Sequence, residues 1–215
     1  GIARQVGVGV AVQRGQAIGE AVVLQRPGHV EGKLRPVVGA GRGFDLAGLR
    51  GAYTQESYAD RELNISTATV RFPLPGAPGT YWERLIDQPA RFGKKKARFS
   101  YGAKYYGQWW SMPGHDMAAL AQASGLWLVE GIFDAIALNQ SAAFKDRGLI
   151  AVSLMSCNNY PEHALAELRR VAAADNRSAP KLTFAFDVGP AGIRWTREFV
   201  KRSRDAGFAV GAAQV

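Results

Sequence analysis

The sequence predicts an α/β fold, with a four-stranded parallel sheet flanked by helices over residues 125–215. A smaller basic α+β subdomain over residues 1–124 is expected to precede it. Short apolar runs alternate with helical patterns through the C-terminal part, which is typical of βαβ units and a parallel sheet. Most of the net positive charge lies in the first 124 residues, where the hydrophobic pattern is weaker.

The composition is that of a globular protein, because 47% of the 215 residues are hydrophobic and can bury a core. An uncharged apolar stretch of about 18 residues is missing, as is a signal-peptide pattern, so we expect no membrane partner and a cytoplasmic location. The single cysteine, Cys157, cannot form an internal disulfide and is interpreted as a small buried hydrophobe. The three histidines lack the spacing of a zinc site.

The charge is uneven along the chain. The formal net charge is +9, of which residues 1–124 carry +7 (16 Lys and Arg against 9 Asp and Glu) and residues 125–215 carry +2 (11 against 9). An excess of this size favours a polyanionic partner, and nucleic acid is the usual one. The N-terminal part is therefore expected to supply the electrostatic surface.

The first elements of the chain are weakly defined. Residues 4–12 and 18–25 alternate and are expected to form a hairpin, while the glycines of residues 39–43 are interpreted as a turn rather than a phosphate loop. Residues 67–74 have the apolar pattern of a strand, and the Pro- and Gly-rich residues 75–79 predict a turn after it.

A basic and aromatic segment follows over residues 80–110. Cations there can pair with phosphates while aromatic rings stack on bases, although a solvated charge run beside core aromatics would look the same. Since Trp109 and Trp110 are adjacent, only one of them is expected to face the core if they lie on a strand. The candidate nucleic-acid-binding cations of this segment are Lys94, Lys95, Lys96, Arg98 and Lys104.

The C-terminal part contains four predicted strands, at residues 126–129, 149–152, 182–186 and 208–212. Helical patterns lie between them, at residues 132–145, from Pro161 onward, and at residues 191–205. The last helix carries one basic face, which is expected to be solvated, yet its first cation could reach a nucleotide phosphate. The members of this face are Arg194, Arg197, Lys201 and Arg204.

Two carboxylates stand where predicted strands end. Glu130 follows the first strand and Asp187 the third, and functional residues of parallel sheets gather at the carboxyl ends of strands. Asp134 lies one helical turn beyond Glu130 and can face the same edge. Converging carboxylates suit Mg²⁺, which prefers oxygen ligands, although an acid at a helix start can also be a simple cap.

These residues lie within two motifs, LWLVEGIFDA at residues 126–135 and TFAFDVGPAG at residues 183–192. The pair resembles the two signatures of the Toprim family, which primases, topoisomerases and some nucleases share. The resemblance implies that the parallel sheet is Toprim-like, with a site for Mg²⁺ or Mn²⁺ in which Glu130 and Asp187 hold the ion. It also implies that Glu130, Asp134 and Asp187 are catalytic, and that Gly131 forms a turn with room for phosphate.

The sequence departs from the family pattern at two places. The second acid of the family's Asp-x-Asp motif falls at Gly189, so one carboxylate is missing and metal affinity should fall. In addition, Met155 and Ser156 stand where many relatives have glycine and a small polar residue.

The order of the basic segment before the acidic motifs resembles that of primases from bacteria and mobile elements. This resemblance implies metal-dependent synthesis of RNA primers from ribonucleotides on single-stranded DNA, and a helicase as a further partner. Two alternatives stay open: a degenerate Toprim module that binds nucleic acid without catalysis, and a Toprim nuclease or topoisomerase subunit.

Overall fold

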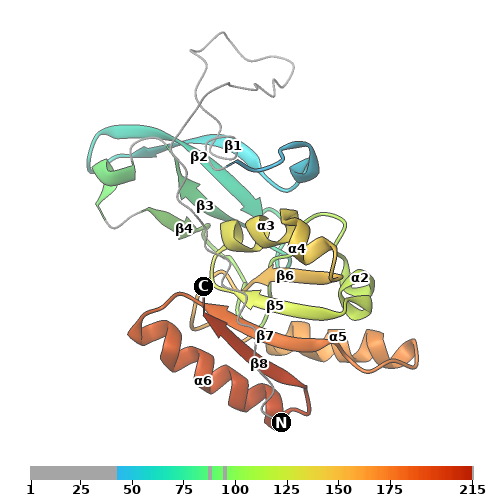
Figure 1. Cartoon of the computed structure of the whole chain (residues 1–215). Helices are drawn as coiled ribbons and strands as arrows, with labels where there is room; N and C mark the ends of the chain where they lie inside the picture. Colours follow the sequence, from blue (N-terminus) through green and yellow to red (C-terminus); the bar gives the residue numbers. More distant parts are fainter. Residues whose placement is uncertain (1–42, 87–88, 94–95, 215) are drawn as a thin grey trace.

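The computed structural model describes residues 43–86, 89–93 and 96–214, which form two four-stranded sheets. One sheet is antiparallel with strand order β1-β2-β3-β4, and the other is parallel with strand order β6-β5-β7-β8. Helices cover both faces of the parallel sheet, and the antiparallel sheet lies beyond α3 (Figure 1). The predicted α/β class and the four-stranded parallel sheet are confirmed.

The antiparallel sheet is a meander in which each strand pairs with the next along the chain. Val70, Phe72 and Leu74 alternate toward the hydrophobic core, while the residues between them face the opposite side. The predicted strand at 67–74 and the turn after it are confirmed. The strands are β1 (Thr54–Asp60), β2 (Ile65–Pro73), β3 (Tyr81–Leu85) and β4 (Ala97–Phe99), with the short helices η1 (Ala47–Leu49) before β1 and η2 (Pro89–Phe92) before β4.

The parallel sheet has two central strands, β5 and β7, which pair with each other over five residues. All three strand pairings are parallel, as the predicted βαβ pattern requires. The strands are β5 (Gly125–Val129), β6 (Leu149–Ser153), β7 (Lys181–Phe186) and β8 (Val210–Gln214).

The helices are α2 (Met117–Gln122), α3 (Ile132–Gln140), α4 (Ala142–Lys145), α5 (Glu162–Ala174) and α6 (Pro190–Asp205). The prediction of one continuous helix over 132–145 is wrong, because the helix is interrupted at Ser141, which separates α3 from α4. The ψ of Ser141 is 141°, which ends α3, and its hydroxyl oxygen accepts a hydrogen bond from the Phe144 amide to begin α4.

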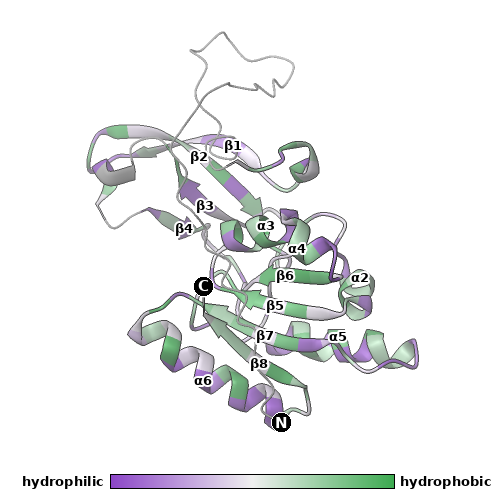
Figure 2. Ribbon diagram, viewed as in Figure 1, coloured by the Kyte–Doolittle hydropathy of each residue, from purple (hydrophilic) through white to green (hydrophobic). Residues whose placement is uncertain are grey.

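Two hydrophobic clusters pack on opposite faces of the parallel sheet. One joins the sheet to α2, α5 and α6, and the other joins it to α3, α4 and the antiparallel sheet. Figure 2 shows the central strands as mainly hydrophobic and α6 as largely hydrophilic. The antiparallel sheet is thus attached to the parallel sheet through a shared core, and the boundary at residue 124 stays a prediction.

Both tryptophans of the basic segment are buried, each with 4% of its surface exposed. The expectation that only one would face the core is wrong, because the sheet has a core on each face. Trp109 packs into the cluster with α5 and α6, whereas Trp110 packs into the cluster with α3. Alternation therefore buries both rings.

The predicted hairpin over residues 4–25 and most of the glycine turn at 39–43 lie outside the described residues. In the part of the chain that the structure describes, none of the helices has the length and apolar character needed to cross a membrane.

Candidate functional site

Glu130 and Asp187 lie at the same edge of the parallel sheet, one residue beyond two neighbouring strands. Val129, the last residue of β5, pairs with Ala185 of β7, so the two strands end almost in register. Because β5 and β7 are the central strands, both acids stand in the middle of the carboxyl edge. The structure thus brings the two predicted acids together.

The carboxyls at this edge influence one another. Burial raises the pKa of Glu130 above its ordinary value, and the negative charges of Asp187 and Asp134 raise it further. Asp187 is exposed, whereas Glu130 is half-buried. An arrangement in which acids repel one another favours a bound cation or a proton, since either relieves the repulsion.

Gly131 and Asp134 form the start of α3. The Gly131 amide donates a hydrogen bond to Oδ2 of Asp134 over 3.2 Å, and a β-carbon at position 131 would lie 2.5 Å from that oxygen. The φ of Gly131 is −99°, which any residue adopts, so the turn does not need glycine; a β-carbon here would only push aside the carboxylate of Asp134 and disturb this hydrogen bond. Asp134 therefore acts as a helix cap, and the phosphate-binding role of Gly131 stays a prediction.

A second glycine, which sequence reasoning did not single out, fixes the loop after β7. Gly192 is buried, and a β-carbon there would collide with the main-chain oxygen of Asp187. Gly189, by contrast, is the N-cap of α6, with extended backbone and open space around its α-carbon. The pair Ala191-Gly192, a small residue and a glycine after the acidic motif, could have indicated this tight contact from the sequence.

Ser153, the last residue of β6, ties that strand to the acidic edge. Its hydroxyl donates a hydrogen bond to the main-chain oxygen of Glu130 over 3.0 Å and accepts one from the Met155 amide. Met155 has a φ of 64°, a conformation that favours glycine, which explains why the relatives' pattern has glycine there. Cys157 follows in the same loop, half-buried against the hydrophobic cluster.

The acidic edge offers few ligands for a metal. Among residues 43–86, 89–93 and 96–214, the structure contains no group of three or more His, Cys, Asp or Glu side chains that could hold a metal ion. Glu130 and Asp187 nevertheless supply two carboxylates, and Mg²⁺ is commonly held by one or two, with water and substrate phosphates completing the shell. The two carboxylates are therefore chemically compatible with a divalent cation that takes its other ligands from water and phosphate.

The predicted cations that the structure describes lie on two parts of it. Lys96, Arg98 and Lys104 are exposed on β4 and the segments beside it, while Lys94 and Lys95 lie outside the described residues. Arg194 is exposed on the first turns of α6, with its guanidinium carbon 5.0 Å from the centre of the Trp195 ring. The structure therefore does not gather all the cations into one cluster.

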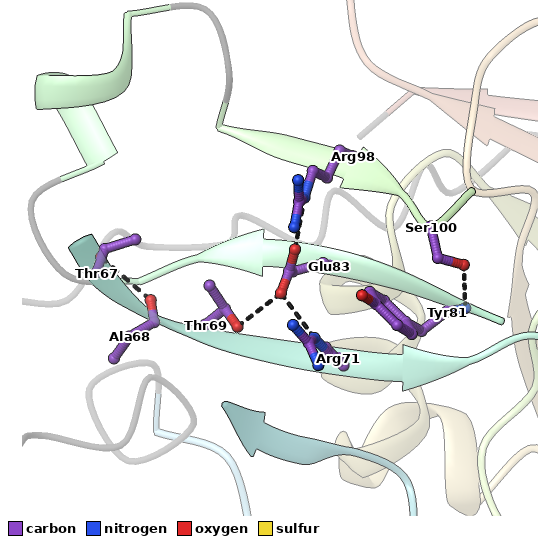
Figure 3. Close-up of polar contacts among 8 residues, drawn as sticks. All are labelled: Thr67, Ala68, Thr69, Arg71, Tyr81, Glu83, Arg98 and Ser100. Atoms are coloured by element: carbon purple, nitrogen blue, oxygen red, sulfur yellow. Dashed lines mark hydrogen bonds and ion pairs between the residues drawn. The ribbon is translucent and has the colours of Figure 1, made fainter. Parts of the chain in front are cut away.

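Arg98 is held by an acid that the sequence analysis missed. Glu83 of β3 is fully buried, and its carboxylate accepts hydrogen bonds from Nε of Arg98 over 2.6 Å and from Nε of Arg71 over 2.7 Å (Figure 3). Thr69 donates a third hydrogen bond to it. Burial alone would raise the pKa of Glu83, but these hydrogen bonds outweigh burial and lower it.

The domain that carries the acidic edge is similar to known proteins. Residues 127–215 match the model of a family described as Toprim-like, which confirms the resemblance of the acidic motifs. The crystal structure of the RNA polymerase domain of Mycobacterium tuberculosis primase DnaG is similar, with 22% identity and a TM-score of 0.46. That similarity covers 73% of this chain and 52% of the DnaG chain, so this chain spans about half of that structure. No curated protein matches.

Proposed function

We propose that the chain is a primase-type nucleotidyltransferase, because residues 127–215 match the model of a Toprim-like family. It would make RNA primers from ribonucleotides on single-stranded DNA, with Mg²⁺ or Mn²⁺. The observation that carries the proposal is the position of Glu130 and Asp187 at the carboxyl ends of the two central strands. The order of the basic, aromatic segment before this domain favours a primase over other Toprim enzymes.

Glu130 and Asp187 would hold the cation. When bound, the cation neutralises phosphate charge and orients the displacement. Asp187 is exposed and can meet the ion together with substrate phosphates. Burial and the neighbouring acids raise the pKa of Glu130 above its ordinary value, which is the direction expected for a carboxylate that accepts a proton.

The reaction would form one phosphodiester bond in each cycle. The 3′-hydroxyl oxygen of the growing strand attacks the α-phosphorus of a ribonucleoside triphosphate, the bond to the pyrophosphate oxygen breaks, and pyrophosphate leaves. In this scheme the hydroxyl proton passes to the carboxylate oxygen of Glu130 that does not bind the cation, while Lys96, Lys104 and Arg194 attract the phosphates of template and nucleotide. Arg98 binds Glu83 through Nε, so the N–H groups at the end of its guanidinium can still donate to a phosphate.

One observation favours the non-catalytic alternative. Gly189 removes a carboxylate from the family's acidic motif, and a module with too few metal ligands could bind nucleic acid without catalysis. The two hypotheses differ in what they predict for product formation, so an assay of products separates them.

The test is to incubate the chain with single-stranded DNA, all four ribonucleoside triphosphates and Mn²⁺, and to resolve the products on a sequencing gel. Labelled oligoribonucleotides that disappear in the Glu130→Gln variant would support the primase. Shortened template would instead support a nuclease. Binding of DNA without either product would support the binding module.

A further inference from the structure

Three aromatic rings form a continuous stack at the end of β4. The rings of Phe99 and Tyr105 lie 3.7 Å apart with an interplanar angle of 2°, and Tyr106 continues the stack at 4.4 Å and 26°. Burial, and then contact with Tyr106, raises the pKa of Tyr105 to about 12. The three rings therefore form one surface of stacked aromatic faces.

Tyr106 is the outer ring of this stack, and 62% of its surface is exposed. One face of its ring is covered by Tyr105, so a large part of the exposed surface belongs to the other face and the ring edge. A half-covered ring at the end of a stack offers the flat apolar face on which another planar ring can continue the series.

The backbone beneath the stack is fixed by Asn159, which is fully buried. The two N–H groups of its side-chain amide are shared among the main-chain oxygens of Tyr105, Gln108 and Leu154, and its oxygen accepts a hydrogen bond from the Gly107 amide over 2.9 Å. These contacts of one buried side chain hold residues 105–108 in one conformation. A preorganised surface of this kind loses little entropy when a ligand binds.

The same asparagine connects the stack to the acidic edge. Leu154 follows β6 directly, and β6 lies next to β5, the strand that ends at Glu130. Ser153 of β6 donates a hydrogen bond to the main-chain oxygen of Glu130. The loop that carries Tyr106 is therefore anchored at the carboxyl edge where Glu130 and Asp187 lie.

Two exposed cations lie close to the stack along the chain. Lys104 directly precedes Tyr105, and Lys96 lies just before β4, whose last residue is Phe99. Cations next to a flat aromatic face are the combination by which proteins bind single-stranded nucleic acid, with phosphate on the cations and bases on the rings.

We propose that the free face of Tyr106 is a stacking platform for an unpaired base of single-stranded DNA, anchored beside the acidic edge. The choice of single-stranded DNA as the ligand rests on the proposed function, whereas binding itself needs neither metal nor catalysis. The platform would hold the template so that it passes the acids of the site.

The test measures binding of an oligodeoxynucleotide that contains 2-aminopurine, in EDTA, by anisotropy and by fluorescence quenching. Tyr106→Ala should lower the affinity roughly 5- to 150-fold, the range expected when one base–aromatic stack is removed. It should also reduce the quenching and leave the slope of log affinity against log salt unchanged, because no cation is removed. Tyr106→Phe should keep wild-type binding.

Tyr101 supplies a matched control, since this neighbouring tyrosine is fully exposed, at 104%. Tyr101→Ala should keep the affinity within about twofold of wild type if Tyr106 carries the stack. Equal effects of Tyr101→Ala and Tyr106→Ala, or undiminished quenching in Tyr106→Ala, would overturn the proposal.

A third variant guards against loss of folding. Tyr106→Leu keeps apolar packing on Tyr105 but removes the ring, so weak binding with an unchanged melting temperature supports stacking, and wild-type binding overturns it. All these readouts are made without metal. Failure of primer synthesis with a clear Tyr106 effect would therefore count against the proposed function and not against the platform.

Discussion

Gly192 lies so close to the main-chain oxygen of Asp187 that a β-carbon at position 192 would collide with it. The contact holds the loop between β7 and α6, so the direction of Asp187 depends on a residue five positions further along the chain.

Gly192→Ala should therefore shift the loop and move Asp187. We expect a loss of about 1–3 kcal/mol in the free energy of unfolding, typical of overpacking, together with weaker Mn²⁺ binding. Urea denaturation and calorimetry measure the two effects. The control is Gly189→Ser, where the space is open and the backbone extended. Equal stability of Gly192→Ala and Gly189→Ser would show that the contact is not a constraint.

Gly189→Asp should restore a carboxylate at the family's second acidic position. The structure can accept the side chain, because nothing lies within 4 Å of a β-carbon there and the φ of −164° suits any residue. We expect roughly tenfold tighter Mn²⁺ binding, since ligand charge sets affinity, and more primer synthesis. Gly189→Ser can cap the helix without adding charge, so it should leave Mn²⁺ affinity unchanged. The prediction fails if the Ser and Asp variants bind Mn²⁺ alike.

Glu83→Gln should destabilise the antiparallel sheet. The variant leaves Arg71 and Arg98 without their anion, which we expect to cost about 1–3 kcal/mol because both guanidiniums keep partial contact with water. Glu56→Gln, on the edge strand β1 of the same sheet, is the control and should cost less, because Glu56 is only half-buried whereas Glu83 is fully buried. Thermal unfolding of the two variants at pH 7 checks this difference.

The effect of Glu83 should also depend on pH. Since the fold lowers the pKa of Glu83, its stabilisation is complete above the range of an unfolded glutamate, about pH 4.3, and is lost as the pH falls through the lowered pKa. The difference in melting temperature between wild type and Glu83→Gln should therefore be largest near neutral pH and shrink in acid. A difference that stays constant would assign the effect to packing alone.

Binding to single-stranded DNA should weaken steeply with salt. Replacing Lys94, Lys95 and Lys96 together by alanine should flatten the slope of log affinity against log salt by up to about 2, since each neutralised phosphate contributes roughly 0.7 to that slope. Lys145→Ala is the control, because this residue precedes β6 at the opposite edge of the parallel sheet. An unchanged slope in the triple variant would place the phosphate contacts elsewhere on the surface.

The sequence was sufficient for those features that depend on local pattern. Apolar runs of four or five residues define the parallel strands, and an acid directly after such a run must lie at the strand's carboxyl end, which places Glu130 and Asp187. The break at Ser141 was missed because residues 132–145 keep helical spacing across it, and a serine inside a helix gives no strong stop signal.

The features that were missed depend on which segments pack together. The burial of both Trp109 and Trp110 follows from a core on each face of the sheet, which spacing along one strand cannot reveal. Glu83 becomes an anion for two arginines only when the register sets it opposite Arg71 and Arg98. Asn159 likewise fixes residues 105–108 only because the fold brings it next to a loop about 50 residues earlier in the chain.

The most direct test of the account is Mn²⁺ binding by calorimetry, in the presence of single-stranded DNA and a non-reacting ribonucleoside triphosphate analogue. We expect weak binding by the wild type alone, tighter binding with the analogue, and at least about a tenfold loss in the Glu130→Gln/Asp187→Asn double variant. Asp205→Asn, at the far end of α6, should bind like wild type. Wild-type Mn²⁺ affinity in the double variant would contradict the assignment of the acidic edge as the metal site.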